Sequence, residues 1–256
     1  MAVFAHPDDE ITVAGTVALY AESGAEVTVV CTTNGAGGMR PDGLSSLDLG
    51  RTRRAELTRA CEILGVKRLD LLEPLDEGHP HLGQQNYQDL AYSEHRRRLR
   101  DLVAEIVPDI VIGFGPDGVT GHPTHVLVGR LTGEAVDDLD EPPPLYRVAY
   151  TDEHLRKVTA WMAAHPGLLA DYADEVEKAP NIGPPTPELI PVPDSAIAVA
   201  IDVTPVIAKK TAAIACHESQ GGSGLLQMFA TCTTESFAAR SGYRQTPLPA
   251  GRFPLG

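Results

Sequence analysis

Residues 26–33 read EVTVVCTT, a run of mainly β-branched side chains that predicts a buried strand. Strand and helix patterns alternate on either side of it. Apolar runs predict further strands at 1–5, 67–72, 109–114 and 146–150, and helical spacing predicts helices at 11–24, 49–64, 93–107 and 122–136. This alternation indicates an α/β fold with a Rossmann-like, mostly parallel sheet and helices on both faces. Ligands of such sheets bind at the carboxyl ends of the strands, near a switch in strand order.

The second half of the chain is less regular. Its patterns predict a helix at 152–172, a proline-rich extended loop at 179–195, a strand at 196–203 and a helix at 205–217. No internal repeat and no sharp change of composition marks a boundary. We therefore expect one domain over 1–256, with a Rossmann-like core over 1–150 and a less regular C-terminal extension and rim over 151–256.

The charge pattern argues against one class of binding partner. The 256 residues carry a formal net charge of −14, and this acidic balance argues against nucleic acid as the main partner. The one dense basic stretch, at 96–100, has acidic neighbours and predicts a solvated helix face. No apolar run approaches the roughly 20 residues of a membrane span. Four cysteines without C-x-x-C spacing, and no leader pattern, predict reduced thiols and a cytoplasmic protein. The sequence leaves open whether the chain forms a homo-oligomer.

The stretch AHPDDE at 5–10 lies where the first predicted strand gives way to the first predicted helix. Its imidazole and carboxylates suit Zn²⁺, which takes three protein ligands in catalytic sites and keeps one position for water. A structural alternative is a helix cap, because Asp8 and Asp9 are good residues for an N-cap and a first helical turn.

A second motif, GHPTH at 121–125, follows the predicted strand at 109–114. Its two histidines stand three residues apart at a helix start and so share one side of the helix. Alone, such a pair is often a surface feature. Because parallel strands end at the same edge of a sheet, however, the two motifs are expected to converge, and together they favour a functional site.

These residues also carry a resemblance to a known family. AHPDDE resembles the signature of the PIG-L/LmbE-like zinc-dependent deacetylases, which include N-acetylglucosaminyl-phosphatidylinositol deacetylases and enzymes of mycothiol and bacillithiol synthesis. HPTH is similar to the family's second motif. The likeness continues over roughly residues 1 to 220, in the stretches Arg53-x-x-Glu56, Leu64-Gly65-Val66, Lys210-x-x-Ala213 and His217-x-Ser219-Gln220.

The resemblance implies a role for each residue of the two motifs. His6, Asp9 and His125 would bind zinc, Asp8 would be the general base, and His122 would stabilise the transition state. These roles agree with the ability of zinc to lower the pKa of bound water to about 7. The family often carries Asp between its two histidines, whereas this chain has Thr124, so His122 lacks an adjacent carboxylate that would raise its pKa.

Four further residues are interpreted with their alternatives. By resemblance, Arg53 and Asp76 would contact the substrate, although a surface helix charge and a turn residue are the respective alternatives. Glu10 is expected to support the helix start or the metal ligands rather than bind zinc. His217 is read either as a residue of the pocket rim or as a satisfied helix histidine.

The function expected from this resemblance is removal of an N-acyl group, in the first place N-acetyl, from an amino-sugar substrate such as an N-acetylglucosamine conjugate. Two alternatives stay open: an amidase acting on a thiol conjugate, and a Rossmann-like protein that binds a sugar or nucleotide without hydrolysing it. The partner is expected to be a small amino sugar or glycoconjugate. Its identity depends on the loops at 73–95 and 179–195, which carry no readable pattern.

Overall fold

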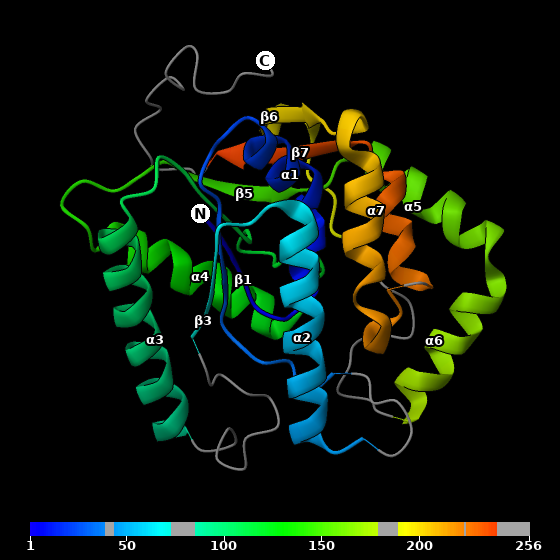
Figure 1. Ribbon diagram of the computed structural model, residues 1–256, viewed down its shortest axis with the longest axis horizontal. Helices are drawn as coiled ribbons and strands as arrows, with labels where there is room; N and C mark the ends of the chain where they lie inside the picture. Colours follow the sequence, from blue (N-terminus) through cyan, green and yellow to red (C-terminus); the bar gives the residue numbers. More distant parts are fainter. Residues whose placement is uncertain (39–43, 73–84, 179–188, 223, 240–256) are drawn as a thin grey trace.

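The structure is a computed structural model that describes residues 1–38, 44–72, 85–178, 189–222 and 224–239 (Figure 1). Its centre is one seven-stranded sheet in the order β3-β2-β1-β4-β5-β7-β6. The strands are β1 (Ala2–Phe4), β2 (Thr28–Cys31), β3 (Arg68–Leu71), β4 (Val111–Gly113), β5 (Leu145–Ala149), β6 (Ile197–Asp202) and β7 (Thr234–Ala239). The first five are parallel, and β7 and β6 extend the sheet in antiparallel pairings. The predicted α/β class with a mostly parallel sheet is confirmed.

The strand order changes direction at β1. Starting from β1, the chain builds outward through β2 to β3, then returns to the other side of β1 as β4. Right-handed crossovers place the helices of these two halves on opposite faces of the sheet. β1 and β4 are therefore neighbours at the switch point, which is where a doubly wound sheet holds its ligand.

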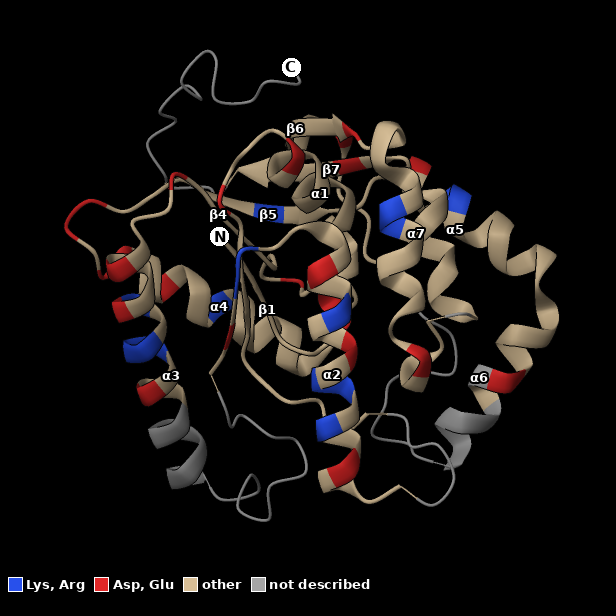
Figure 2. Ribbon diagram, in the orientation of Figure 1, with Lys and Arg blue, Asp and Glu red and all other residues tan. Residues whose placement is uncertain are grey.

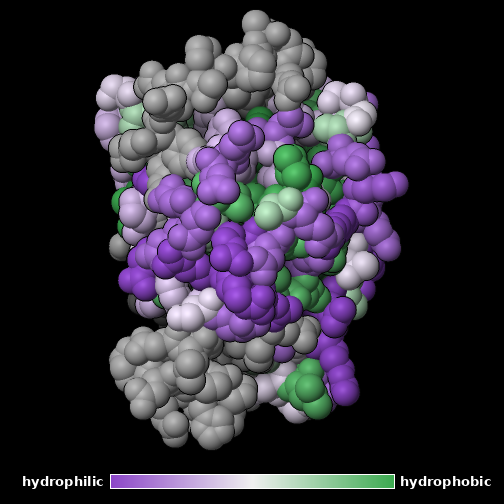
Figure 3. Space-filling view, turned by 90° about the vertical axis from the view of Figure 1, so that its left-hand side faces the viewer, coloured by the Kyte–Doolittle hydropathy of each residue, from purple (hydrophilic) through white to green (hydrophobic). Residues whose placement is uncertain are grey.

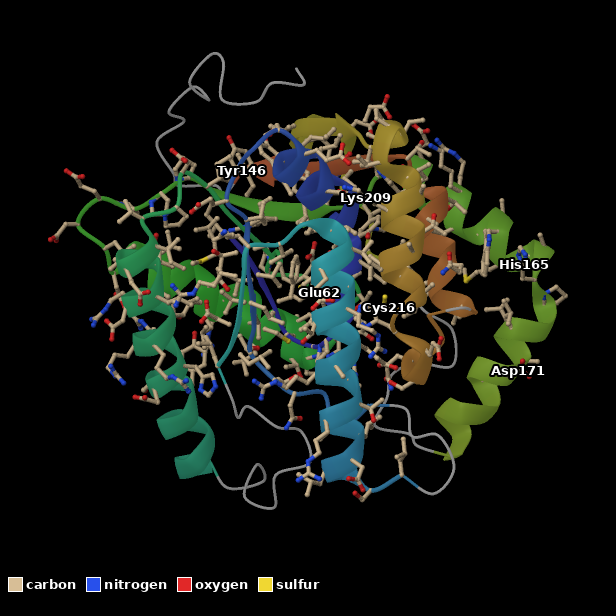
Figure 4. The ribbon with its side chains drawn as sticks, in the orientation of Figure 1. Glu62, Tyr146, His165, Asp171, Lys209 and Cys216 are labelled. Atoms are coloured by element: carbon tan, nitrogen blue, oxygen red, sulfur yellow. The ribbon has the colours of Figure 1, made fainter. Side chains whose placement is uncertain are left out.

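Several helices of the described residues pack against one another as well as against the sheet. The α-helices are α1 (Ala14–Glu22), α2 (Ser46–Leu64), α3 (Gln85–Ile106), α4 (Pro123–Asp137), α5 (Asp152–Ala164), α6 (Pro166–Lys178) and α7 (Ile207–Ala215). α1 and α2 pack against α7, while α3 packs against α4 (Figure 1). Figure 4 shows Glu62 of α2 and Cys216 at the end of α7 where those two helices meet.

Local sequence explains the ends of α2. Ser45 accepts a hydrogen bond from the Asp48 amide at 3.1 Å and so satisfies one amide of the first turn. Gly65 ends the helix in the left-handed region, with φ of 79°, which glycine adopts without a steric penalty. This helix matters for the site because it carries Arg53 and Glu56, both buried.

The core explains why β1 and β2 read as continuous apolar runs. All three residues of β1 and all four of β2 are buried, and Val3 and Val30 are fully so. Strands covered by helices on both faces carry mainly apolar side chains. The four cysteines are free, as the sequence predicts.

Several features of the structure differ from the predictions. α3 begins at Gln85, within the stretch 73–95 that was expected to be a loop. The helix predicted at 152–172 is two helices, α5 and α6, because Pro166 has no amide hydrogen to continue the ladder and disfavours helical backbone at His165. The helix predicted at 11–24 starts as a 3₁₀ segment, η1 (Asp9–Val13), before α1. β7 is a strand that the sequence patterns did not predict.

Charged side chains are mixed in sign along α2 and α3 (Figure 2). The basic stretch on α3 forms ion pairs: Arg96 with Asp138 at 2.6 Å and Arg97 with Glu94 at 2.7 Å. The molecular face shown in Figure 3 is largely hydrophilic, with smaller hydrophobic patches between the charged groups. The predicted solvated helix face agrees with these contacts. Within the described ranges, no helix is both long and apolar enough to span a membrane.

Candidate metal centre and active site

The two sequence motifs meet at the switch point of the sheet. His6, Asp8 and Asp9 follow the end of β1, and His122 and His125 lie at the start of α4, which follows β4. β1 and β4 are adjacent and parallel, so their carboxyl ends open onto the same edge. The fold therefore brings together all five site residues that the sequence places in the two motifs.

Three side chains place their donor atoms in a tight cluster. His6 Nδ1 lies 3.1 Å from His125 Nε2, His125 Nε2 lies 3.2 Å from Asp9 Oδ1, and His6 Nδ1 lies 3.4 Å from Asp9 Oδ2. A tetrahedral zinc ion about 2.0–2.1 Å from its ligands spaces neighbouring donors roughly 3.3–3.4 Å apart. The donor set and its spacing thus fit a metal ion held by two imidazoles and one carboxylate.

The surrounding backbone orients these donors. Asp9 Oδ2 accepts hydrogen bonds from the amides of His6 at 2.7 Å and Ala5 at 3.1 Å. His125 Nδ1 lies 3.1 Å from the Gly118 carbonyl oxygen, which leaves Nε2 facing the cluster. Partners of this kind fix the ring orientation and tautomer of metal-binding histidines. Burial works to raise the pKa of Asp9, but the adjacent His125 and His6 lower it well below its usual value.

His122 stands beside the cluster as the N-cap residue of α4. Its Nδ1 accepts the Thr124 amide hydrogen at 3.3 Å. The ring centroids of His122 and His125 are 4.8 Å apart, and those of His122 and His6 are 5.1 Å apart. The donor atoms of His6, His122 and His125 lie within 4.8 Å of one another, a grouping that could itself hold a metal ion, and His122 is close enough to act on a group bound at the cluster.

Asp8 is held in an unusual backbone conformation. Its φ is 136°, a value that side-chain-bearing residues rarely adopt. The Asp8 carboxylate lies 3.0 Å from Arg53 Nη2, and the same nitrogen donates to the Pro7 carbonyl oxygen at 2.8 Å. Burial raises the pKa of Asp8, while the positive charge of Arg53 lowers it. Backbone strain of this type persists only where the surroundings impose it, and it is frequent at active sites.

Arg53 is enclosed by the loop that follows β2. Only 3% of the residue is exposed, and its Nη1 donates to the Gly35 carbonyl oxygen at 2.9 Å. A Cβ at Gly38 would lie 2.2 Å from Arg53 Nη1, so glycine is needed there for the loop to close over the guanidinium. The structure thus aims Arg53 at Asp8, and the substrate contact that the sequence suggests for it stays a prediction. Asp76 lies outside the described residues.

A buried pair that the sequence did not predict lies against this turn. His217 Nε2 is 2.5 Å from Glu10 Oε1, and both residues are at most 1% exposed. Burial alone would lower the pKa of His217, but the charge and hydrogen bond of Glu10 raise it. Neither residue lies at a rim. A second contact, from the amide and hydroxyl of Ser219 to the Glu56 carboxylate at 2.8 and 2.7 Å, docks the same C-terminal turn onto α2.

Comparison with known proteins gives the family. Residues 1–136 match the PIG-L family model, described as GlcNAc-PI de-N-acetylase. Among curated relatives, a 1D-myo-inositol 2-acetamido-2-deoxy-alpha-D-glucopyranoside deacetylase of Saccharomonospora viridis is 31% identical, covering 98% of this chain and 92% of the relative. The corresponding deacetylase of Nakamurella multipartita is 33% identical, over 86% of this chain and 78% of the relative.

Solved structures share the fold. The 4-carboxy-2-hydroxymuconate hydratase of Pseudomonas putida superposes with a TM-score of 0.63 at 19% identity, covering 95% of this chain and 96% of the hydratase. The N,N'-diacetylchitobiose deacetylase of Pyrococcus horikoshii gives a TM-score of 0.59 at 22% identity, covering 97% and 86%. Since one neighbour is a hydratase, this likeness speaks for the fold alone. The family match and the sequence relatives carry the assignment: this chain belongs to the PIG-L family of de-N-acetylases.

Proposed function

We propose that this protein is a zinc-dependent hydrolase that removes the N-acetyl group from an amino-sugar substrate, such as a conjugate of N-acetylglucosamine. The observation that carries the proposal is the convergence of His6, Asp9 and His125 donor atoms within 3.4 Å of one another, with Asp8 alongside. The curated relatives named above act on a 2-acetamido-2-deoxy-glucopyranoside, which supports an acetamido sugar as the substrate class.

In this proposal His6, Asp9 and His125 hold the zinc ion. Bound there, zinc would polarise the amide carbonyl and lower the pKa of a bound water. Its two histidine neighbours lower the pKa of Asp9 well below its usual value, and the backbone amides of Ala5 and His6 orient its carboxylate. The protein therefore supplies a preorganised, negatively charged donor between two imidazoles.

Asp8 is the proposed general base. Burial raises its proton affinity, which favours uptake of a proton, while Arg53 keeps the carboxylate oriented. His122 is the proposed stabiliser of the transition state. Because its Nδ1 accepts the Thr124 amide hydrogen, its Nε2 carries the ring proton and can donate it to a developing oxyanion. The backbone amide thus takes over part of the orienting role that a carboxylate at position 124 would have.

The proposal is tested by metal analysis and acetate release. Purified protein is expected to hold about one zinc per chain. It is expected to release acetate from at least one of N-acetylglucosamine, N,N'-diacetylchitobiose and N-acetylglucosaminyl inositol. Asp8→Ala is expected to lower turnover at least a hundredfold and to retain most of the zinc. Full activity of Asp8→Ala, or release of the acyl group from a thiol conjugate only, contradicts the proposal.

A further inference from the structure

The pair Glu10–His217 joins the first turn of the chain to a turn more than two hundred residues later. Glu10 Oε1 meets His217 Nε2, and Glu10 Oε2 accepts the amide hydrogen of Asp8 at 3.1 Å. One carboxylate thus connects His217 to the backbone of Asp8. None of the donor contacts within the cluster of His6, Asp9 and His125 involves Glu10 or His217.

The Asp8 backbone needs such support. A φ of 136° is strained for a residue with a side chain, and such strain persists only where the surroundings impose it. The peptide group that precedes this residue is held at both of its ends: Arg53 Nη2 donates to the Pro7 carbonyl oxygen, and Glu10 Oε2 accepts the Asp8 amide hydrogen. Together these contacts fix the direction in which the Asp8 carboxylate points.

Glu10 in turn depends on His217. The Glu10 carboxylate is 1% exposed, and a buried carboxylate is stable only when it is paired. His217 is delivered by a tight turn, in which its carbonyl oxygen accepts the amides of Gln220 at 3.0 Å and Gly222 at 2.8 Å. A Cβ at Gly222 would lie 2.4 Å from the Ile214 carbonyl oxygen, so this turn closes only around glycine.

From this chain of contacts we infer that Glu10 and His217 are positioning residues for the general base. They hold Asp8 in its strained conformation and touch neither substrate nor metal. The inference rests on the proposed role of Asp8. Its consequence is kinetic: disturbing His217 should lower kcat while leaving KM and the zinc content near their wild-type values, because the metal ligands keep their own supports.

His217 offers a matched pair of variants. Its Nε2 makes the contact with Glu10, whereas its Nδ1 is buried without a hydrogen-bond partner. The amide nitrogen of Gln reaches the position of Nε2, and that of Asn reaches the position of Nδ1. His217→Gln is therefore expected to keep kcat within about threefold of wild type, and His217→Asn to lower it at least tenfold, with acetate release measured on the best substrate of the screen above.

A control separates positioning from general stability. His154 is also a buried histidine, with Nε2 2.8 Å from the Thr234 carbonyl oxygen, and its side chain completes the capping box at the start of α5. His154→Asn is expected to lower the melting temperature and to leave kcat unchanged at a temperature where the variant is folded. If His154→Asn and His217→Asn lower kcat by the same factor, or if His217→Gln and His217→Asn are alike, the inference is overturned.

A double-mutant cycle with Asp8→Ala gives the decisive readout. If His217 acts only through Asp8, adding His217→Asn to Asp8→Ala should not lower the residual rate further. An additional tenfold loss would show that His217 acts independently of Asp8 and would refute the positioning role. Failure of the proposed function is distinguishable, because it appears in the Asp8→Ala single variant as retained activity whatever happens at His217.

Discussion

At the scale of single residues, Lys210 shows how this fold accommodates a buried charge. The side chain is 1% exposed, and its Nζ donates to Glu235 Oε1 at 2.8 Å and to the Cys232 carbonyl oxygen at 3.0 Å. Glu235 also accepts the amides of Gly15 and Thr16 at 2.9 and 2.8 Å. The carboxylate of a C-terminal strand therefore caps the first helix, where the helix dipole favours a negative charge.

Breaking this pair should be costly. Lys210→Met leaves the Glu235 carboxylate buried with amide partners only, so we expect the free energy of unfolding to fall by about 3–5 kcal/mol. The adjacent Lys209 is the control: it pairs with Glu22 at the surface, where both side chains are more than 40% exposed (Figure 4). Lys209→Met is expected to cost less than about 1 kcal/mol. Equal losses in urea denaturation would contradict this account.

At the scale of elements, α1 packs tightly against Val203, which follows β6. A Cβ at Gly15 would lie 2.4–2.7 Å from three side-chain atoms of Val203, which is fully buried. Helix propensity favours alanine over glycine by roughly 1 kcal/mol. The steric conflict between the added methyl group and Val203 outweighs this gain, because neither the helix nor the strand end can move without disturbing the core.

Gly15→Ala is therefore expected to lower the free energy of unfolding by about 1–3 kcal/mol, the usual cost of overpacking. The same change at Gly167, an exposed position of α6 with no atom within 4 Å of its Cβ, is expected to raise it by up to about 1 kcal/mol. Denaturation curves of the two variants should therefore give changes in the free energy of unfolding that are opposite in sign. A gain in stability from Gly15→Ala would show that the Val203 side chain can move to accommodate the methyl group, and would contradict the expected overpacking.

The elements that were predicted have local sequence signals, whereas the strand that was missed depends on partners distant in the sequence. β2 and α2 were predictable because their signals are local: a β-branched run for the strand, and a glycine at position 65 that ends the helix. β7 was not predicted. It pairs antiparallel with β5 and β6, and the partners that make it a strand lie far away in the sequence. The break between α5 and α6 had a local signal in Pro166, which the helical spacing around it masked.

At the scale of the whole molecule, the contrast between local and long-range signals also applies to the site. It separates the residues of the two motifs from the residues that support them. His6, Asp8, Asp9, His122 and His125 lie in two short motifs that follow adjacent parallel strands, so topology alone predicts that they meet. The supports of these residues come from elsewhere: Arg53 from α2, and His217 and Ser219 from the turn after α7. Nothing in a local pattern shows that a histidine at 217 pairs with a glutamate at 10, because only the closed fold brings them together.

Because the proposed metal ligands come from both sides of the switch point, metal binding should stabilise the whole fold. A ligand that binds only the native state adds about 2.7 kcal/mol at a hundredfold excess over its Kd. We expect treatment with a chelator to lower the melting temperature, and added zinc to restore it. His125→Ala should remove this response, because the ligand following β4 is lost. His165→Ala changes an exposed histidine at the end of α5 and should leave the response intact (Figure 4). If zinc still raises the melting temperature of His125→Ala, the metal binds elsewhere, and the cluster of His6, Asp9 and His125 is not the metal site.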